Sequence, residues 1–203
     1  MMLTSQFESA LDDLMARIHG VLVVVYNGRH GAGAGVLAGD GLVLTNNHVA
    51  GDGRALEVTL DDGSTYKAKV MKRNTNADLA LLEIAEHGHS GATISTKEPR
   101  PGEMVFAYGH PWGQRAVLTG GVLSAVTAAH TRKGELPILR SDVQLAPGNS
   151  GGPLLNAAGE VLGLNAMIFG GDQSVAIPAS VIREFLGDAR KSMPHKKVAE
   201  DIL

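Results

Sequence analysis

The amino-acid sequence predicts an all-β protein built from two six-stranded barrels, with a short helix at each end. Short β-branched or aliphatic runs are separated by glycine, aspartate and asparagine, as is typical of barrels and sandwiches. These runs form two sets of similar size, on either side of a segment rich in Gly, Ser, Thr, Pro and His. The 26 glycines suit a chain with many tight turns.

Both ends of the chain predict a helix. In residues 1–20, apolar side chains recur at helical spacing after Thr4 or Ser5, either of which can cap the helix. These side chains are Phe7, Leu11, Leu14, Met15 and Ile18. Residues 179–203 predict a C-terminal helix to position 191 and then a tail, with one apolar face against the second barrel. That face consists of Val181, Ile182, Phe185 and Leu186.

The first barrel is predicted over residues 21–86. Its strands are expected at 21–26, 33–37, 42–45, 56–60, 65–72 and 79–84. A linker over residues 87–102 then leads to the second barrel, over residues 103–178. Its strands are expected at 103–108, 117–126, 138–143, 153–156, 161–168 and 174–177.

Composition excludes several classes of function. With 44% hydrophobic and 19% charged residues the chain is globular, and a formal net charge of -3 without a basic stripe argues against nucleic-acid or membrane partners. Because cysteine is absent, disulfides, thiolate catalysis and Cys-ligated zinc are excluded. The first twenty residues lack the pattern of a signal peptide, so a cytoplasmic location is expected by default; a periplasmic or secreted location applies if a leader has been removed.

The segment from Pro147 to Pro153 places a serine, Ser150, among closely spaced glycines. Such a turn exposes the hydroxyl, and the N–H groups of Gly148 and Ser150 can converge on one point, as an oxyanion hole requires. A glycine-rich hairpin with a solvent-facing serine is the alternative for this segment taken alone.

Two further segments supply the partners that a serine nucleophile needs. His48 follows an apolar strand, where the imidazole would emerge beside a loop, although a lone histidine there is more often structural. Asp78 directly precedes a strongly apolar run, where a carboxylate needs a donor such as an imidazole N–H. A weakly nucleophilic serine requires a base, and the base requires an orienting group, so His48, Asp78 and Ser150 form a candidate triad.

The chain order of these residues decides between two kinds of hydrolase. Gly148-x-Ser150-x-Gly152 also matches the nucleophile elbow of α/β-hydrolases, which needs a following helix and the order Ser, Asp, His. Here a strand follows the serine, and both partners precede it. The order His, Asp, Ser is that of the two-barrel proteases.

These motifs resemble the HtrA (Deg) family of chymotrypsin-fold serine proteases. The resemblance rests on Thr45-Asn-Asn-His48-Val, Asp78-Leu-Ala-Leu-Leu and Gly148-Asn-Ser150-Gly-Gly-Pro-Leu, and on Tyr108-Gly-His-Pro-Trp-Gly113, Gly163-Leu-Asn-Ala and Ala176-Ile-Pro. It implies a chymotrypsin-like double barrel covering positions 5 to 190 and a serine endopeptidase that acts on polypeptides, including unfolded proteins, without a cofactor. Family members usually continue into a PDZ domain, for which this sequence leaves no room.

The resemblance also implies roles for the surrounding residues. Gly148, Asn149 and Ser150 would form the oxyanion hole, and Asn149 stands where zymogens carry an aspartate, so no proteolytic activation is expected. Order in residues 146–149 would switch activity, biased by loops at 109–115, 130–136 and 169–172.

Substrate recognition and assembly are expected from the same comparison. The primary-specificity pocket would have walls of Leu145, Phe169 and Gln173 and no aspartate, which predicts small or medium apolar P1 residues. Leu164, Asn165, Ala166 and Met167 would pair with the substrate backbone as an added strand. A homotrimer would form through the N-terminal segment, with Leu3 and Phe7 as candidate contacts.

Two alternatives to this interpretation remain at the level of the sequence. His87-Gly-His89 has two imidazoles that can bind a metal, but a linker is favoured because no carboxylate cluster accompanies them beyond Glu83 and Glu86. The second alternative is a binding or scaffold protein that keeps the protease fold while being catalytically silent or activated by a partner.

Overall fold

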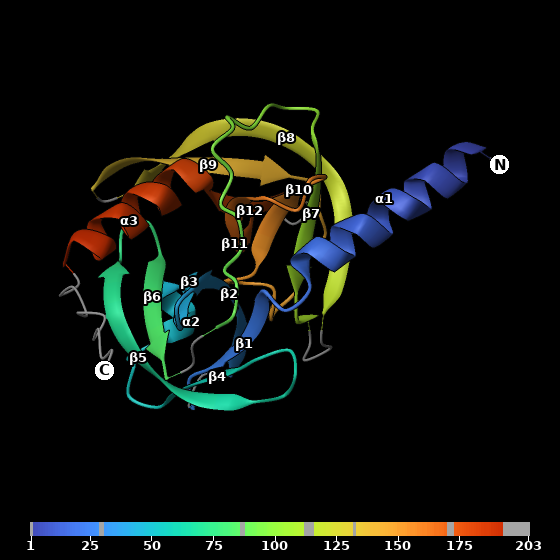
Figure 1. Cartoon of the computed structure of the whole chain (residues 1–203). Coiled ribbons are helices and arrows are strands. Elements are labelled where there is room, and N and C mark those ends of the chain that lie inside the picture. The colour runs from blue at the N-terminus through green and yellow to red at the C-terminus, as the bar shows by residue number, and fades with distance from the viewer. Residues whose placement is uncertain are drawn as a thin grey trace, which may run out of the picture.

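The computed structural model describes residues 2–28, 31–85, 88–111, 116–131, 133–169 and 173–192. Its strands form two closed barrels that lie side by side (Figure 1). The predicted chymotrypsin-like double barrel is thereby confirmed. In the first barrel the strand order is β1-β2-β3-β6-β5-β4, and in the second it is β10-β11-β12-β9-β8-β7.

The strands of both barrels follow the predicted runs closely. The first barrel contains β1 (Leu22–Tyr26), β2 (Ala32–Gly39), β3 (Leu42–Asn46), β4 (Leu56–Thr59), β5 (Thr65–Asn74) and β6 (Leu79–Ile84). The second contains β7 (Met104–Gly109), β8 (Val117–Thr131), β9 (Gly134–Ser141), β10 (Pro153–Asn156), β11 (Val161–Phe169) and β12 (Gln173–Pro178). A short helix, α2 (Asn47–Ala50), follows β3.

The predicted loop at 130–136 is wrong, since most of that range belongs to a long hairpin. β8 runs on to Thr131 and β9 starts at Gly134, with His130 paired to Glu135. Gly134 has φ +115°, which supplies the tight reversal that the hairpin needs. The end of β8 is largely exposed, so its side chains lack the apolar alternation from which a strand is predicted.

Three apolar clusters stabilise this arrangement. One fills the first barrel and includes Val23, Val43 and Leu82. A smaller one, with Leu123 and Leu154, fills the second barrel. The third lies between the barrels and contains residues from both, among them Leu44, Leu79, Phe106, Leu155 and Leu164. Because this third cluster is buried and contains residues of both barrels, it fixes the relative position of the barrel edges from which the candidate site is built.

The two terminal helices join the interface cluster in different ways. α3 (Ala179–Ser192) buries Ile182 and Phe185 in it, as the sequence predicted. α1 (Met2–Ile18) buries Leu14 and Ile18 there, while residues 5–10 are all exposed and the helix projects away from the body of the protein (Figure 1). None of the helices in the described ranges is long and apolar enough to cross a bilayer.

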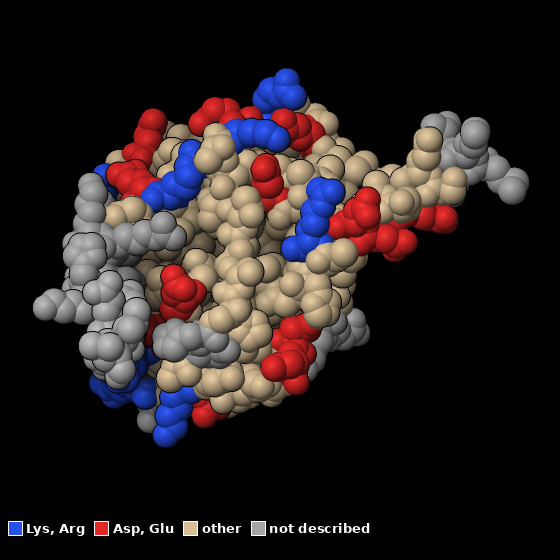
Figure 2. Space-filling model, viewed as in Figure 1, with Lys and Arg blue, Asp and Glu red and all other residues tan. Residues whose placement is uncertain are grey.

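Acidic and basic side chains are mixed over the face shown in Figure 2. No large area of that face carries basic residues alone. This distribution agrees with the small net charge of -3 and provides no electrostatic footprint for a polyanion on that face.

Candidate active site

The site begins with the turn between β5 and β6, which carries Asp78. The Asn74 Oδ1 atom accepts the N–H groups of Asn76 (3.1 Å) and Ala77 (3.0 Å), so one side chain shapes the turn. Ala77 and Leu79 are 1% and 0% exposed, and they anchor the backbone on either side of Asp78. Asp78 itself has φ +52°, a left-handed conformation that is uncommon outside glycine and needs support from its surroundings.

Asp78 supplies that support by binding the segment that carries His48. The Asp78 carbonyl accepts the Asn47 N–H (3.0 Å) and the Asn46 side-chain Nδ2 (3.1 Å). The carboxylate Oδ1 accepts the His48 N–H (2.9 Å), and Oδ2 lies 2.6 Å from His48 Nδ1. The first N–H groups of a helix lack partners within it, and Asp78 satisfies two of them. His48 therefore lies in α2 rather than in the loop expected at the strand end.

Ser150 is brought to the same place by the glycine-rich turn before β10. Its carbonyl accepts the N–H of Ala34, in β2 of the first barrel, at 2.8 Å. The Ala34 carbonyl in turn accepts the hydroxyl of Thr45, which lies just before α2 and is fully buried, at 2.7 Å. Ala34 thus connects the serine turn to the histidine segment.

Glycines allow this close approach of the two barrels. A Cβ atom on Gly151 would fall 2.0 Å from the Ala34 carbonyl oxygen, and one on Gly33 would fall 2.7 Å from the Val49 side chain and 3.1 Å from the Ser150 carbonyl oxygen. Residues with side chains do not fit at either position.

The Ser150 hydroxyl donates to the carbonyl of Ala166, at 3.1 Å. It forms no hydrogen bond with His48, a residue that also lies in the described part of the chain. The side chain of His48 is 50% exposed and that of Asp78 27%. The structure therefore joins His48 and Asp78 directly, while the Ser150 hydroxyl has a different partner.

The backbone around Ser150 leaves two donors unused. Within the described residues, neither the Gly148 N–H nor the Ser150 N–H donates a hydrogen bond. Asn149 is different, because its N–H donates to the Ala146 carbonyl (3.0 Å) and its buried side chain lies against Gly109. Gly148 has φ +106°, and a Cβ there would fall 2.2 Å from the His110 carbonyl oxygen. Asn149 thus shapes the turn, and the free donors flank it.

The predicted substrate-binding residues divide into four groups. Leu164 and Asn165 are buried, with the Asn165 side chain turned to the Pro153 carbonyl (2.9 Å). Ala166 presents its carbonyl to Ser150, at an irregularity in the pairing of β11 with β12. Leu145 packs partly buried against the core of the second barrel, and Gln173 is half-buried. The side chains of Met167 and Phe169 lie outside the described residues, as does the loop at 170–172.

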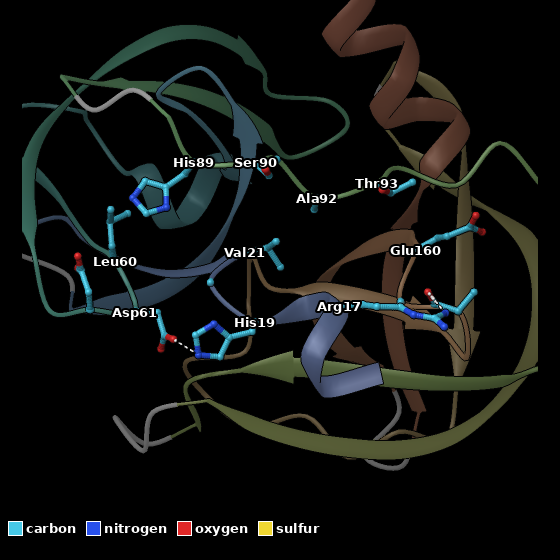
Figure 3. A pocket seen from close by; sticks show the side chains of 15 residues that line it. Arg17, His19, Val21, Leu60, Asp61, His89, Ser90, Ala92, Thr93 and Glu160 are labelled. Carbon is cyan, nitrogen blue, oxygen red and sulfur yellow. Dashed lines mark hydrogen bonds and ion pairs between the residues drawn. The ribbon is translucent and has the colours of Figure 1, made fainter. Parts of the chain in front are cut away.

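A cavity of about 560 Å³ adjoins the candidate triad. Asp78 and Ala166 line it together with the β8–β9 hairpin and the apolar side chains of Val175 and Ile177. A larger cavity, of about 920 Å³, lies between the barrels and away from these residues, under the linker that carries His89 (Figure 3).

Polar contacts line the larger cavity. His19 pairs with Asp61 at 3.2 Å, and Glu160 lies across the cavity from them (Figure 3). The pKa of Glu160 is lowered, mainly by the hydrogen bond from Asn156. The pKa of Tyr108 is raised, mainly by burial and to a smaller extent by the charge of Asp61. In the ranges that the structure describes, no group of three or more His, Asp or Glu residues is arranged to hold a metal ion. His87 lies outside the described residues.

Several residues that build the site were not predicted from the sequence. Ala34 acts through a contact between segments far apart in the chain, and Asn74 acts within its own turn, and neither was singled out. Asn46 lies in the motif from Thr45 to Val49, but its hydrogen bond to the Asp78 carbonyl depends on the packing. Gly109 had a signal, since it lies in the motif from Tyr108 to Gly113, but its role as the neighbour of Asn149 depends on the packing.

Comparison with known proteins agrees with this geometry. Residues 33–164 match the trypsin-like peptidase domain family. Serine protease HTRA1 from Xenopus laevis is 35% identical over 160 residues, which are 76% of this chain and 35% of that protein. A probable periplasmic serine endoprotease DegP-like from Pseudomonas fluorescens is 38% identical over 152 residues, 72% of this chain and 32% of that protein. The crystal structure of the serine endoprotease from Yersinia pestis aligns with a TM-score of 0.79 at 28% identity, covering 89% of this chain and 66% of that one.

The fold defines a two-barrel protein, and the chain belongs to the trypsin-like peptidase domain family. Within it the chain is similar to HtrA and DegP-like serine proteases, as its motifs indicated. It spans only 35% and 32% of the length of the two relatives above.

Proposed function

We propose that the protein is a serine endopeptidase in which Ser150 is the nucleophile, His48 the general base and Asp78 the group that orients His48. The observation that carries this proposal is the contact of 2.6 Å between Asp78 Oδ2 and His48 Nδ1. A carboxylate at Nδ1 keeps the proton on that nitrogen, so the other ring nitrogen, Nε2, is free to accept a proton.

The reaction follows from these roles. Ser150 Oγ attacks the carbonyl carbon of the scissile bond while His48 Nε2 takes the hydroxyl proton, and the carbonyl oxygen becomes an oxyanion. The C–N bond then breaks, and His48 gives its proton to the leaving amine. Water attacks the resulting ester by the same route and releases the acid and the free serine.

The unused N–H groups of Gly148 and Ser150 support an oxyanion hole in this turn. Asn149 holds the turn through its N–H, which donates to the Ala146 carbonyl at 3.0 Å, and through its buried side chain against Gly109. We propose that order in residues 146–149 switches activity. We expect the initial rate of hydrolysis to depend on substrate concentration in a sigmoidal manner. A hyperbolic dependence, together with an oxyanion hole that is formed without substrate, would contradict the switch.

The substrate is proposed to bind as a strand along β11. β10 pairs with β11 from Val161 to Leu164, and the segment before β10 continues this pairing, because the Gly151 N–H donates to the Asn165 carbonyl and the Asn165 N–H donates to the Gly152 carbonyl, each at 2.9 Å. Among the described residues, no strand lies beside the same edge from Ala166 onward. Extended peptides bind to such edges through main-chain hydrogen bonds. The Ala166 carbonyl at this edge accepts the Ser150 hydroxyl, which places the added strand next to the nucleophile.

The P1 side chain is proposed to be small or medium and apolar. The support comes from Leu145 and Gln173, because neither wall offers a carboxylate to a buried lysine or arginine. A peptide library with each amino acid at P1 tests this preference. Cleavage led by Ala, Val or Leu is expected, and a profile led by basic residues contradicts it.

Covalent labelling tests the proposed function directly. A fluorophosphonate should label the full chain once, at Ser150, and Ser150→Ala should abolish labelling and nearly all peptide hydrolysis. A residual acceleration of about 10³ to 10⁴ over water should remain from binding and the oxyanion hole. Hydrolysis of a casein substrate by the wild-type chain but by neither Ser150→Ala nor His48→Ala supports the assignment. Equal hydrolysis by all three contradicts it.

One observation favours a second candidate function, a protease-fold binding protein that is silent until a partner acts. The Ser150 hydroxyl is bound to Ala166 and not to His48. If the protein is such a binding protein, the wild-type chain should bind unfolded polypeptide without being labelled by fluorophosphonate. A serine endopeptidase should be labelled.

Location and assembly are further proposals. Relatives described as probable periplasmic serine endoproteases favour a periplasmic or secreted location over the cytoplasmic default. Polypeptides, including unfolded proteins, are the proposed substrates, by similarity to these proteases. A homotrimer through α1 is proposed because residues 5–10 of this helix are exposed, with Phe7 among them.

A further inference from the structure

A hydrogen bond between side chains of the two barrels reaches the turn that carries Asp78. The Thr131 hydroxyl, at the end of β8 in the second barrel, donates to Asn76 Oδ1 in the first barrel at 2.8 Å. Asn76 lies two residues before Asp78, in the turn shaped by Asn74. The contact therefore connects the long hairpin to the acid of the candidate triad.

Packing holds Ala77, which is 1% exposed, but it holds Asn76 less firmly, because Asn76 is only half-buried. Asn76 and Ala77 line both the cavity of about 560 Å³ beside Asp78 and a neighbouring one of about 530 Å³ below α3. Side chains next to open space lack van der Waals contacts on that side. A hydrogen bond therefore contributes more to fixing the position of Asn76 than it would for a fully packed side chain. The need for such a contact is real, because Asp78 has φ +52°.

Thr131 also organises the turn of its own hairpin. Its hydroxyl donates to the Gly134 carbonyl at 2.7 Å and accepts the Lys133 N–H at 3.2 Å. A hydroxyl has one proton, so the Asn76 amide and the Gly134 carbonyl share it. The conformation of the hairpin end and the position of the Asp78 turn consequently depend on the same atom.

We propose that Thr131 is a positioning residue for the triad. By holding Asn76, it fixes the turn from which the Asp78 carboxylate contacts His48. This inference rests on the proposed role of Asp78 in catalysis, and it adds a contact from the second barrel to an acid–base pair that comes from the first.

The test compares Thr131→Val, which keeps the shape and removes the hydroxyl, with Thr131→Ser, which restores it. Thr127→Val is the matched control, since Thr127 lies on the same strand and lines the same cavity but holds no part of the Asp78 turn. In Thr131→Val, kcat for a peptide substrate should fall about tenfold, the effect of one neutral hydrogen bond, with KM unchanged. Thr131→Ser should recover kcat, and Thr127→Val should match the wild type.

A second readout does not need activity. In Ser150→Ala protein, the proton on His48 Nδ1 should give a far-downfield NMR resonance because it lies between two atoms 2.6 Å apart. Adding Thr131→Val should shift or broaden this resonance, and adding Thr127→Val should not. Asn76→Ala should have the same effect on the resonance as Thr131→Val. The double variant should have no larger effect than either single variant, because both substitutions remove the same hydrogen bond.

The outcomes separate this inference from the proposed function. If Thr131→Val leaves the resonance and kcat unchanged, or if Thr127→Val alters them equally, Thr131 is not a positioning residue. If the wild-type chain neither hydrolyses peptides nor reacts with fluorophosphonate, the proposed function fails while the resonance still decides the role of Thr131.

Discussion

The Asp78 carboxylate contacts His48 at two points, the backbone N–H through Oδ1 at 2.9 Å and the ring Nδ1 through Oδ2 at 2.6 Å. One carboxylate thus fixes both the start of α2 and the orientation of the ring at its surface. The contact with the backbone N–H fixes the position of the His48 backbone, and the contact with Nδ1 fixes the orientation of its ring. The two oxygens therefore hold different parts of His48, one the backbone and the other the ring.

Asp78→Asn should separate these two contributions. The amide has the shape of the carboxylate, and its oxygen can still accept a hydrogen bond from the His48 backbone N–H. Its NH₂ group, however, cannot accept a hydrogen bond from the ring Nδ1–H. We expect the fold to persist and kcat to fall by about 10⁴-fold, the loss known when such an acid becomes an amide. Circular dichroism and peptide hydrolysis measure the two effects, and Asp62→Asn, at an exposed turn, is the control. Activity within tenfold of the wild type would exclude Asp78 as the orienting group.

Gly109→Ala should disrupt the turn around Ser150 from outside it. A Cβ at Gly109 would fall 2.6 Å from Asn149 Oδ1 and 3.0 Å from its Cα, and Asn149 is 3% exposed, with no room to move away. We expect fluorophosphonate labelling to fall at least tenfold and the protein to lose about 1 to 3 kcal/mol of stability, as overpacked positions do.

Gly187→Ala is the control for that substitution. Gly187 lies in α3 with no atom within 4 Å of the added Cβ, so alanine should leave labelling unchanged and stabilise the helix by up to about 1 kcal/mol. If Gly109→Ala labels as fast as the wild type, the contact with Asn149 does not control the turn.

The fold was predictable where local patterns and burial agree. Runs such as 79–84, with five of six residues buried, and the Pro153–Asn156 strand between a glycine turn and Gly159 have clear limits in the sequence. Strands at 117–126 and 138–143 were predicted, but the outer end of the β8–β9 hairpin was missed. That exposed end is stabilised by pairing between strands, and Ser124, Thr127 and His130 indicate no buried face.

The candidate site was predictable in its chemistry and not in its support. His48, Asp78 and Ser150 follow from the chemistry that a serine nucleophile requires. The left-handed conformation of Asp78 and the links through Ala34 and Asn46 come from tertiary contacts, for which no residue type is diagnostic. Sequence reasoning therefore proposes the reacting groups, and the structure shows how these residues are held.

Glu160 should make stability depend on pH in the acid range. Its Oε2 accepts Asn156 Nδ2 at 2.8 Å and the Ser95 hydroxyl at 3.2 Å, and these contacts lower its pKa from the ordinary 4.5. A carboxyl whose pKa is lowered by folding stabilises the protein fully above its unfolded-state pKa. That contribution disappears as the pH falls through the lowered value.

Glu160→Gln measures this contribution. The variant should be less stable than the wild type by about 1 kcal/mol at pH 7, and the difference should shrink progressively below pH 4.5. Urea unfolding at several pH values gives the difference. Glu98→Gln, at an exposed position of the linker, should show no such dependence. A difference between Glu160→Gln and wild type that stays constant from pH 7 to pH 3 would rule out a charge-dependent role.

Phe7→Glu should weaken self-association through α1. Residues 5–10 are exposed, Phe7 by 50%, and an isolated helical segment of this length is marginal in water unless its apolar face is covered. We propose that α1 of a second copy packs against this face. A glutamate at position 7 would then place an unpaired charge in the interface. Ser9→Glu adds the same charge about 200° around the helix and is the matched control. Sedimentation over a range of concentrations should show trimers for the wild type and Ser9→Glu, and monomers for Phe7→Glu. Wild-type protein that sediments as a monomer at every concentration would contradict assembly through α1, and trimers in all three would place the interface elsewhere.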